Sequence, residues 1–198
     1  MKILTRVFLA LLLLLLTIWV LVQFTPVQNW LVRQASRKLS KELQTEVSIK
    51  HVDFSLFNKM LLEGVLVKDR NKDTLAYIGR AGLNISDWFF LKDKAVISNA
   101  NLEHTNIFLH RTDSIWNYQF LVDYFGGSST SSGKKKKGIE LSLQKVSLTD
   151  FHIVQKDEWR GETMEGKIGF LKLSPNEINF NKQIIDIDRL EIEQPYFA

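Results

Sequence analysis

The sequence contains no cysteine and none of the familiar short motifs of catalysis or nucleotide binding. Without cysteine the chain cannot form a disulfide, a thiolate metal site or a cysteine nucleophile. It also lacks the H-E-x-x-H zinc motif, the G-x-S-x-G serine elbow, the Walker phosphate loop and the G-x-G-x-x-G dinucleotide fingerprint. We therefore expect no catalytic residues, no metal ion, no cofactor and no enzyme activity.

An excess of one charge sign is also missing once a single lysine run is set aside. The chain has 26 basic and 22 acidic residues, a net charge of +4, and Lys134–Lys137 supplies the whole difference. Nucleic-acid binding depends on a basic surface, so we expect no nucleic-acid partner. With 198 residues, 45% of them hydrophobic and 24% charged, the composition excludes a disordered chain and a polytopic membrane protein.

The first long feature is an apolar segment at the N-terminus. Residues 7–22 are apolar except for one threonine, a run longer than a signal-peptide core and without a small-residue cleavage site. About 18 such residues are just enough to span a bilayer. We expect a transmembrane signal-anchor over residues 1–24, with Lys2 and Arg6 at the membrane interface and the N-terminus in the cytoplasm. A cleaved signal and a buried soluble helix are the alternatives.

Residues 25–44 have the pattern of a short amphipathic helix. Thr25 and Pro26 form a good helix start, and apolar side chains then recur every four residues opposite a basic face. Two roles are open for this helix. It lies on the outer membrane surface with Trp30 at headgroup depth, or it covers the open end of the sheet that follows.

The rest of the chain has the pattern of strands, arranged in two similar units. The order apolar-x-apolar-x-x-apolar-x-apolar occurs at 47–54 and again at 141–148. Two further collinear matches have a similar offset, which suggests a unit of about 90 residues. We expect a first β-repeat unit over 45–125 and a second, truncated one over 139–198. A flexible Gly/Ser/Lys loop over 126–138 joins them.

The x-x step in this pattern has a structural consequence. Side chains alternate between the two faces of a strand, so a three-residue gap between apolar positions moves them to the other face. A bulge or bend must absorb the extra residue if one face is to stay apolar. Repeated bends predict a mainly β fold with a curved, open sheet and an apolar trough, while a flat sandwich is the alternative. The candidate trough residues are Ile49, Val65, Val67, Leu83, Ile85, Leu102, Leu143, Val146, Leu171, Leu173 and Leu190.

The order of these features resembles a known family. Residues 62–69 (LEGVLVKD), Ile85-Ser86 and residues 116–120 (WNYQF) are followed by a low-complexity loop and by residues 139–148 (IELSLQKVSL). With the anchor and the amphipathic helix, they resemble the N-terminal portion of AsmA-like proteins. The closer match is the TamB (translocation and assembly module) branch, as it occurs in Bacteroidota-type sequences. Family members are usually several times longer, so we expect an N-terminal fragment.

The resemblance implies an inner-membrane-anchored periplasmic protein of outer-membrane biogenesis with a long β-groove. Such proteins are thought to pass phospholipid toward the outer membrane, and TamB is also linked to outer-membrane protein assembly. The expected function is therefore a lipid conduit, in which a groove supplies about 0.8 kcal/mol per buried CH₂ of an acyl chain. The alternative is an assembly scaffold for outer-membrane or secreted proteins. It acts on a partner protein by β-strand augmentation at a free sheet edge.

Overall fold

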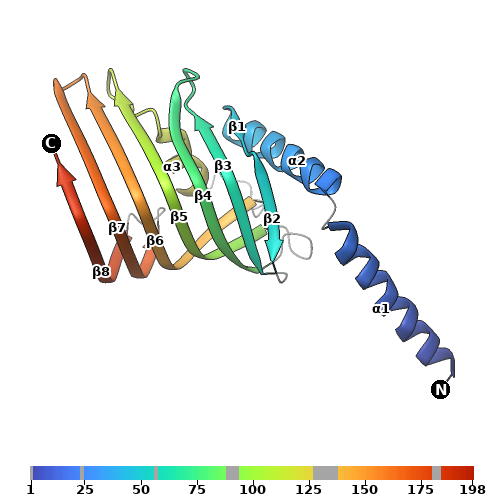
Figure 1. The fold of residues 1–198 in the computed structure, drawn as a ribbon. Helices are drawn as coiled ribbons and strands as arrows, with labels where there is room; N and C mark the ends of the chain where they lie inside the picture. Colours follow the sequence, from blue (N-terminus) through green and yellow to red (C-terminus); the bar gives the residue numbers. More distant parts are fainter. Residues whose placement is uncertain (1, 23–24, 56–57, 88–93, 127–137, 180–183) are drawn as a thin grey trace, which may run out of the picture.

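The computed structural model describes residues 2–22, 25–55, 58–87, 94–126, 138–179 and 184–198. The described residues form three helices and one eight-stranded sheet (Figure 1). The elements are α1 (Lys2–Val22), α2 (Thr25–Leu43), β1 (Val47–Ser48), β2 (His51–Ser55), β3 (Lys59–Lys68), β4 (Thr74–Asp87), β5 (Lys94–Arg111), α3 (Gln119–Gly126), β6 (Gly138–Asp157), β7 (Glu162–Asn179) and β8 (Ile184–Phe197).

The sheet is a single curved layer that does not close on itself. Its strand order is β1-β3-β4-β5-β6-β7-β8, and β2 pairs with β3 beside β1. Neighbouring strands are antiparallel except β5 and β6, which run parallel. A parallel pair needs a crossover connection, and α3 lies within it. A mainly β, curved sheet was predicted, whereas the flat sandwich is wrong because the described strands all belong to one sheet.

Bulges occur at three-residue steps between apolar residues, which lie at 97–100 on β5 and 187–190 on β8 as well as in the two copies of the pattern. Asn84 pairs with Asn99 and Ile85 with Ile97, which leaves Ser98 as an extra residue on β5. The pairing of β7 with β8 likewise leaves Asp188 without a partner. Register also shifts where residues 141–145 of β6 meet β5, and the first copy of the pattern breaks between β1 and β2. The prediction that a bulge or bend absorbs the extra residue is confirmed.

A row of special backbone residues also crosses the sheet from β3 to β8. Each strand contributes one residue, and the pairs on either side place these residues opposite one another. On four strands the residue has a positive φ of 52–60°, the left-handed region, and on β4 and β7 it is glycine. We call these residues the kink row: Gly64, Gly79, His104, Asp150, Gly169 and Gln194.

The kink row keeps apolar side chains on one face across a second three-residue step. Leu62 and Val65 lie on either side of Gly64, yet both pack in the same hydrophobic cluster. The same spacing occurs on the other strands, so apolar positions continue across the row. The matching rows are Leu62, Ala81, Leu102, Leu148, Leu171 and Ile192 on one side, and Val65, Ile78, Thr105, Phe151, Ile168 and Pro195 on the other.

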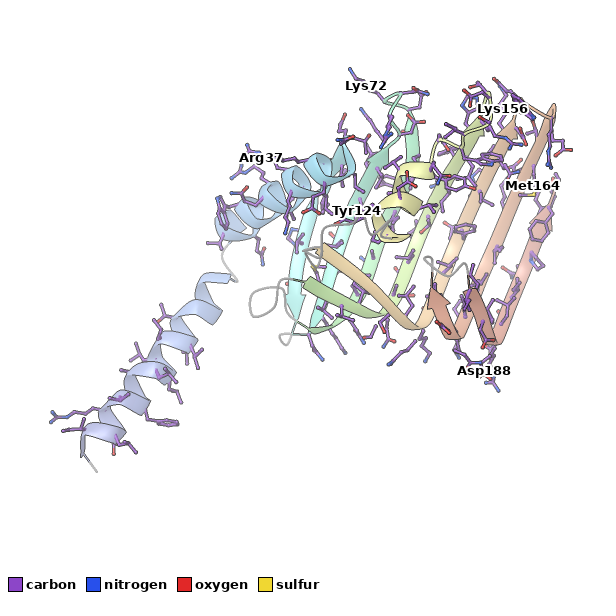
Figure 2. The ribbon with its side chains drawn as sticks, turned by 180° about the vertical axis from the view of Figure 1, so that it is seen from behind. Arg37, Lys72, Tyr124, Lys156, Met164 and Asp188 are labelled. Atoms are coloured by element: carbon purple, nitrogen blue, oxygen red, sulfur yellow. The ribbon has the colours of Figure 1, made fainter. Side chains whose placement is uncertain are left out.

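Helices α2 and α3 cover the β1–β4 end of this apolar face. Val67 of β3 belongs to both hydrophobic clusters, one containing Val32 of α2 and the other Phe120 of α3. Both helices therefore lie on the same side of the sheet (Figure 2). The N-terminal parts of β5 and β6, which precede the register shift between these strands, cross over this side of the sheet (Figure 2). This side is therefore the concave face. Of the two roles left open for residues 25–44, covering the end of the sheet is the one that the packing shows.

Helix α1 projects away from the sheet (Figure 1). Its large apolar side chains from Ile3 to Leu16 are each exposed by 50% or more. No helix in the described ranges combines the length and apolarity needed to cross a membrane. Of the loop predicted over 126–138, Gly126 ends α3, Gly138 begins β6 and the residues between lie outside the described ranges.

Candidate functional site

The candidate site is the part of the concave face that α2 and α3 leave uncovered. Among the predicted trough residues, Ile49 and Val65 are buried in the cluster beneath Val32 of α2. Ile85 is only 3% exposed and is paired with the buried Ile97 at the bend of β5. These three positions belong to the core, so the accessible surface comes from residues further along the sheet.

The remaining predicted positions are partly exposed, and exposure is greatest on β8. Leu190 is 50% exposed at the β8 edge. It stands in register with Leu173 of β7 and Val146 of β6, so side chains from three strands continue one apolar row. The half-buried predicted positions on this face are Val67, Leu83, Leu102, Val146, Leu171 and Leu173, and Leu143 is half-buried where the register of β6 against β5 shifts.

Other residues of this face were absent from the predicted set. Their signal in the sequence was the three-residue step at the kink row, which is present on all six strands from β3 to β8. It becomes recognisable as a feature of the whole sheet only when the strand registers are known. These additional apolar residues are Ile107, Phe151, Ile153, Ile168, Ile187, Ile192 and Phe197.

The opposite, convex face carries ion pairs between neighbouring strands together with aromatic side chains such as Phe108, which is 38% exposed. Arg80 of β4 lies 3.5 Å from Glu63 of β3 and 3.6 Å from Glu103 of β5. Lys172 of β7 lies 3.7 Å from Glu191 of β8. These ion pairs place charged side chains of five strands on the convex face.

Histidines on β5 and β6 also lie close to carboxylates on the neighbouring strands. His104 Nδ1 lies 2.7 Å from Asp150, and His152 Nε2 lies 2.9 Å from Glu165. Hydrogen bonds from Lys167 and then from His152 lower the pKa of Glu165. The described residues contain no group of three or more side chains suited to hold a metal ion.

An ion pair between Arg111 and Asp157, which we call the clasp, joins the C-terminal ends of β5 and β6. The guanidinium of Arg111 binds the Asp157 carboxylate, whose side chain is 3% exposed, and it also lies over the ring of Trp116 at 4.7 Å. The hydrogen bond from Arg111 lowers the pKa of Asp157 and raises that of the guanidinium. Through Trp116 the clasp also contacts the segment that leads into α3. The guanidinium of Arg111 is paired with Asp157.

The predicted membrane-interface residues lie on α1 and α2. Lys2 begins α1 and Arg6 lies in its second turn, while Trp30 of α2 is 53% exposed. These positions neither contribute to the concave face nor test the predicted contact with a membrane.

Comparison with known proteins leaves the family resemblance as a prediction. No protein-family model matches the sequence, and no curated protein matches it. The functional argument therefore rests on the residues and their arrangement.

Proposed function

We propose that the concave face binds the acyl chains of phospholipid in transit between two membranes. The observation that supports this proposal is the continuity of the apolar face, which the bulges and the kink row maintain across strands of up to 20 residues. A soluble domain gains nothing by exposing such a surface, whereas a lipid carrier requires it. The β5–β8 half is the open part of this face.

The proposed mechanism needs no catalytic group. An acyl chain in water exposes its methylene groups, which costs free energy. Contact with a row of leucine and isoleucine side chains lowers this free energy by about 0.8 kcal/mol per buried CH₂. The headgroup stays in water at the rim. Because the apolar rows run from strand to strand, a chain can move along them without passing a charged side chain.

The proposal places the protein at the bacterial inner membrane, in the manner of an AsmA-like or TamB protein. The apolar run of residues 7–22, which contains a single threonine, supports a single-pass anchor, with Lys2 and Arg6 at the cytoplasmic interface. The exposed side chains of α1 suit contact with lipid. Trp30 would then lie near the periplasmic headgroups, and the sheet would stand in the periplasm.

The test compares two β8 substitutions with matched exposure on opposite faces. Leu190 is 50% exposed on the concave face, and Tyr196 is 53% exposed on the convex face. Both Leu190→Asp and Tyr196→Asp leave the new carboxylate in contact with water, so both variants should fold. Mass spectrometry of co-purified lipid should show a severalfold loss for Leu190→Asp alone. Equal phospholipid in the two folded variants would contradict the proposal.

A second candidate function is supported by the edge of the sheet. On its outer side β8 has no strand partner among the described residues, so its backbone donors and acceptors are open to an incoming strand. This edge supports the scaffold alternative, in which the protein holds a segment of an outer-membrane or secreted protein by β-strand augmentation.

A further inference from the structure

Helix α2 has two unlike faces, and the sheet uses only one of them. Val32 and Leu43, which are 7% and 6% exposed, lie in the hydrophobic clusters that join α2 to the sheet. An amphipathic helix normally enters a bilayer with its apolar side chains, but in α2 those side chains are already buried. Any contact between α2 and a membrane must therefore use the opposite face of the helix.

That opposite face carries one aromatic side chain and three cations. We call it the outer face of α2, and it consists of Trp30, Arg33, Arg37 and Lys41. These positions are i, i+3, i+7 and i+11, a spacing that keeps side chains on one side of an α-helix. Trp30 is 53% exposed, and the three basic residues are exposed as well. The outer face is thus open to solvent along its whole length.

The three cations of the outer face are unpaired. None of them has an acidic partner within the ranges that the structure describes. The only acidic residue of α2 is Glu42, which accepts a hydrogen bond from the hydroxyl of Tyr124 on α3 at 2.6 Å. Glu42 also lies 4.0 Å from Lys38. The negative charge of α2 therefore lies on the flank toward α3, and the outer face is purely basic.

The outer face begins close to the proposed membrane anchor. Two residues of the chain separate α1 from α2, and Trp30 lies in the second turn of α2. Tryptophan is enriched at membrane interfaces because its ring is apolar and its N–H group is polar. At a rise of 1.5 Å per residue, the outer face is about 16 Å long from Trp30 to Lys41. The headgroup layer is only about 5–8 Å deep, so the whole face reaches it when α2 lies along the membrane surface.

We propose that the outer face of α2 binds the anionic headgroups of phospholipids in the membrane that holds α1. This inference rests on the anchorage in the proposed function and does not depend on movement of lipid along the concave face. Each basic side chain near an anionic surface strengthens binding about fivefold, so three strengthen it about a hundredfold. Because α2 is packed on the β1–β4 end of the sheet, this contact holds that end of the concave face at the bilayer surface.

The test places a probe on the outer face of the full chain. Since the chain has no cysteine, Gln34→Cys at an exposed position one turn after Trp30 allows a single fluorophore to be attached. The labelled protein is inserted into vesicles of phosphatidylcholine, with or without about one quarter phosphatidylglycerol. Both kinds of vesicle contain a lipid with a nitroxide on its headgroup, which quenches the fluorophore only at short range.

Docking through charge has a signature that insertion of apolar side chains lacks. We expect quenching to be at least about threefold stronger in the vesicles with phosphatidylglycerol. At about 1 M salt the Debye length is about 3 Å, and the quenching should return to the level seen with phosphatidylcholine alone.

Two triple variants separate the outer face from the net charge of the chain, since each removes three positive charges. The first combines Arg33→Gln, Arg37→Gln and Lys41→Gln. The control combines Lys59→Gln, Lys72→Gln and Lys145→Gln, at exposed positions on strands and turns of the sheet. The first variant should lose the extra quenching and the control should keep it. Because all six side chains are exposed, thermal unfolding of both variants should match that of the unchanged chain.

Three results would overturn the proposal. These are equal quenching in the two kinds of vesicle, a difference that survives high salt, and a difference that persists in the outer-face variant. Equal quenching would leave the outer face to a different partner, such as a protein with an acidic surface. Flotation of the same vesicles tests the anchorage separately. A chain that floats with neutral vesicles but shows equal quenching contradicts this inference alone, whereas a chain that does not float contradicts the anchor and this inference together.

Discussion

The kink row predicts that two glycines on the same strand respond very differently to the same substitution. A Cβ added at Gly79 would stand 3.0 Å from Cβ of His104 and 3.3 Å from the Glu103 carbonyl oxygen. Neither neighbour is the end of a flexible side chain, so β4 and β5 must move apart. A Cβ added at Gly82 would meet its nearest atom at 3.8 Å, which is ordinary contact.

The expected magnitude follows from the cost of overpacking. Forcing extra volume into a tight site costs about 1–3 kcal/mol, and the two contacts at Gly79 suggest about 2 kcal/mol. For a chain of this size that corresponds to a fall of about 4–8 °C in Tm. Gly82→Ala should change the free energy of unfolding by less than about 0.5 kcal/mol.

A second substitution identifies the cause. His104 adopts a φ of 53°, and His104→Gly removes both the left-handed strain and the side chain that Gly79→Ala would meet. Alone it should be nearly neutral, because a more flexible unfolded chain offsets the relief. In the double variant it should restore at least about 1 kcal/mol. Thermal unfolding followed by circular dichroism measures the unchanged chain, the three single variants and the double variant. Equal Tm values for Gly79→Ala and Gly82→Ala, or additive effects in the double variant, would refute the reasoning.

Three further predictions concern the clasp and the core. Asp157 has a lowered pKa in the folded chain, so its contribution to stability is present above the ordinary aspartate pKa and is lost as pH falls through the folded value. Asp157→Asn should therefore be less stable than the unchanged chain at pH 7, with a gap in Tm that narrows below about pH 4; a constant gap would contradict the ion pair. Leu43→Ala, which empties a 6%-exposed site between α2 and β1, should cost about 2–5 kcal/mol in denaturant unfolding. The exposed Trp30→Ala should cost under about 0.5 kcal/mol, and equal losses would argue against packing of α2 on the sheet. Ile85→Asp places a charge at a 3%-exposed position and should abolish cooperative unfolding, whereas a folded variant would show that this bend is open to water.

The sequence alone predicted the features that depend on local periodicity. Because a three-residue step must be absorbed wherever one face stays apolar, the pattern predicted bulges or bends and the curvature that follows from them, and the register shows such bulges at Ser98 and Asp188. The four-residue period and the Thr-Pro start likewise located α2 to within a residue.

The tertiary structure decided which apolar positions are accessible, because burial depends on neighbours distant in the sequence. Ile49 and Val65 have the same pattern as Leu190, but α2 covers the first two and no described element covers the third. The kink row could be recognised only from the strand register. In the sequence, nothing links a left-handed residue on one strand to the glycine that faces it on the next. The parallel pairing of β5 with β6 brings together segments separated by α3 and its crossover, and neither period nor propensity specifies such a contact.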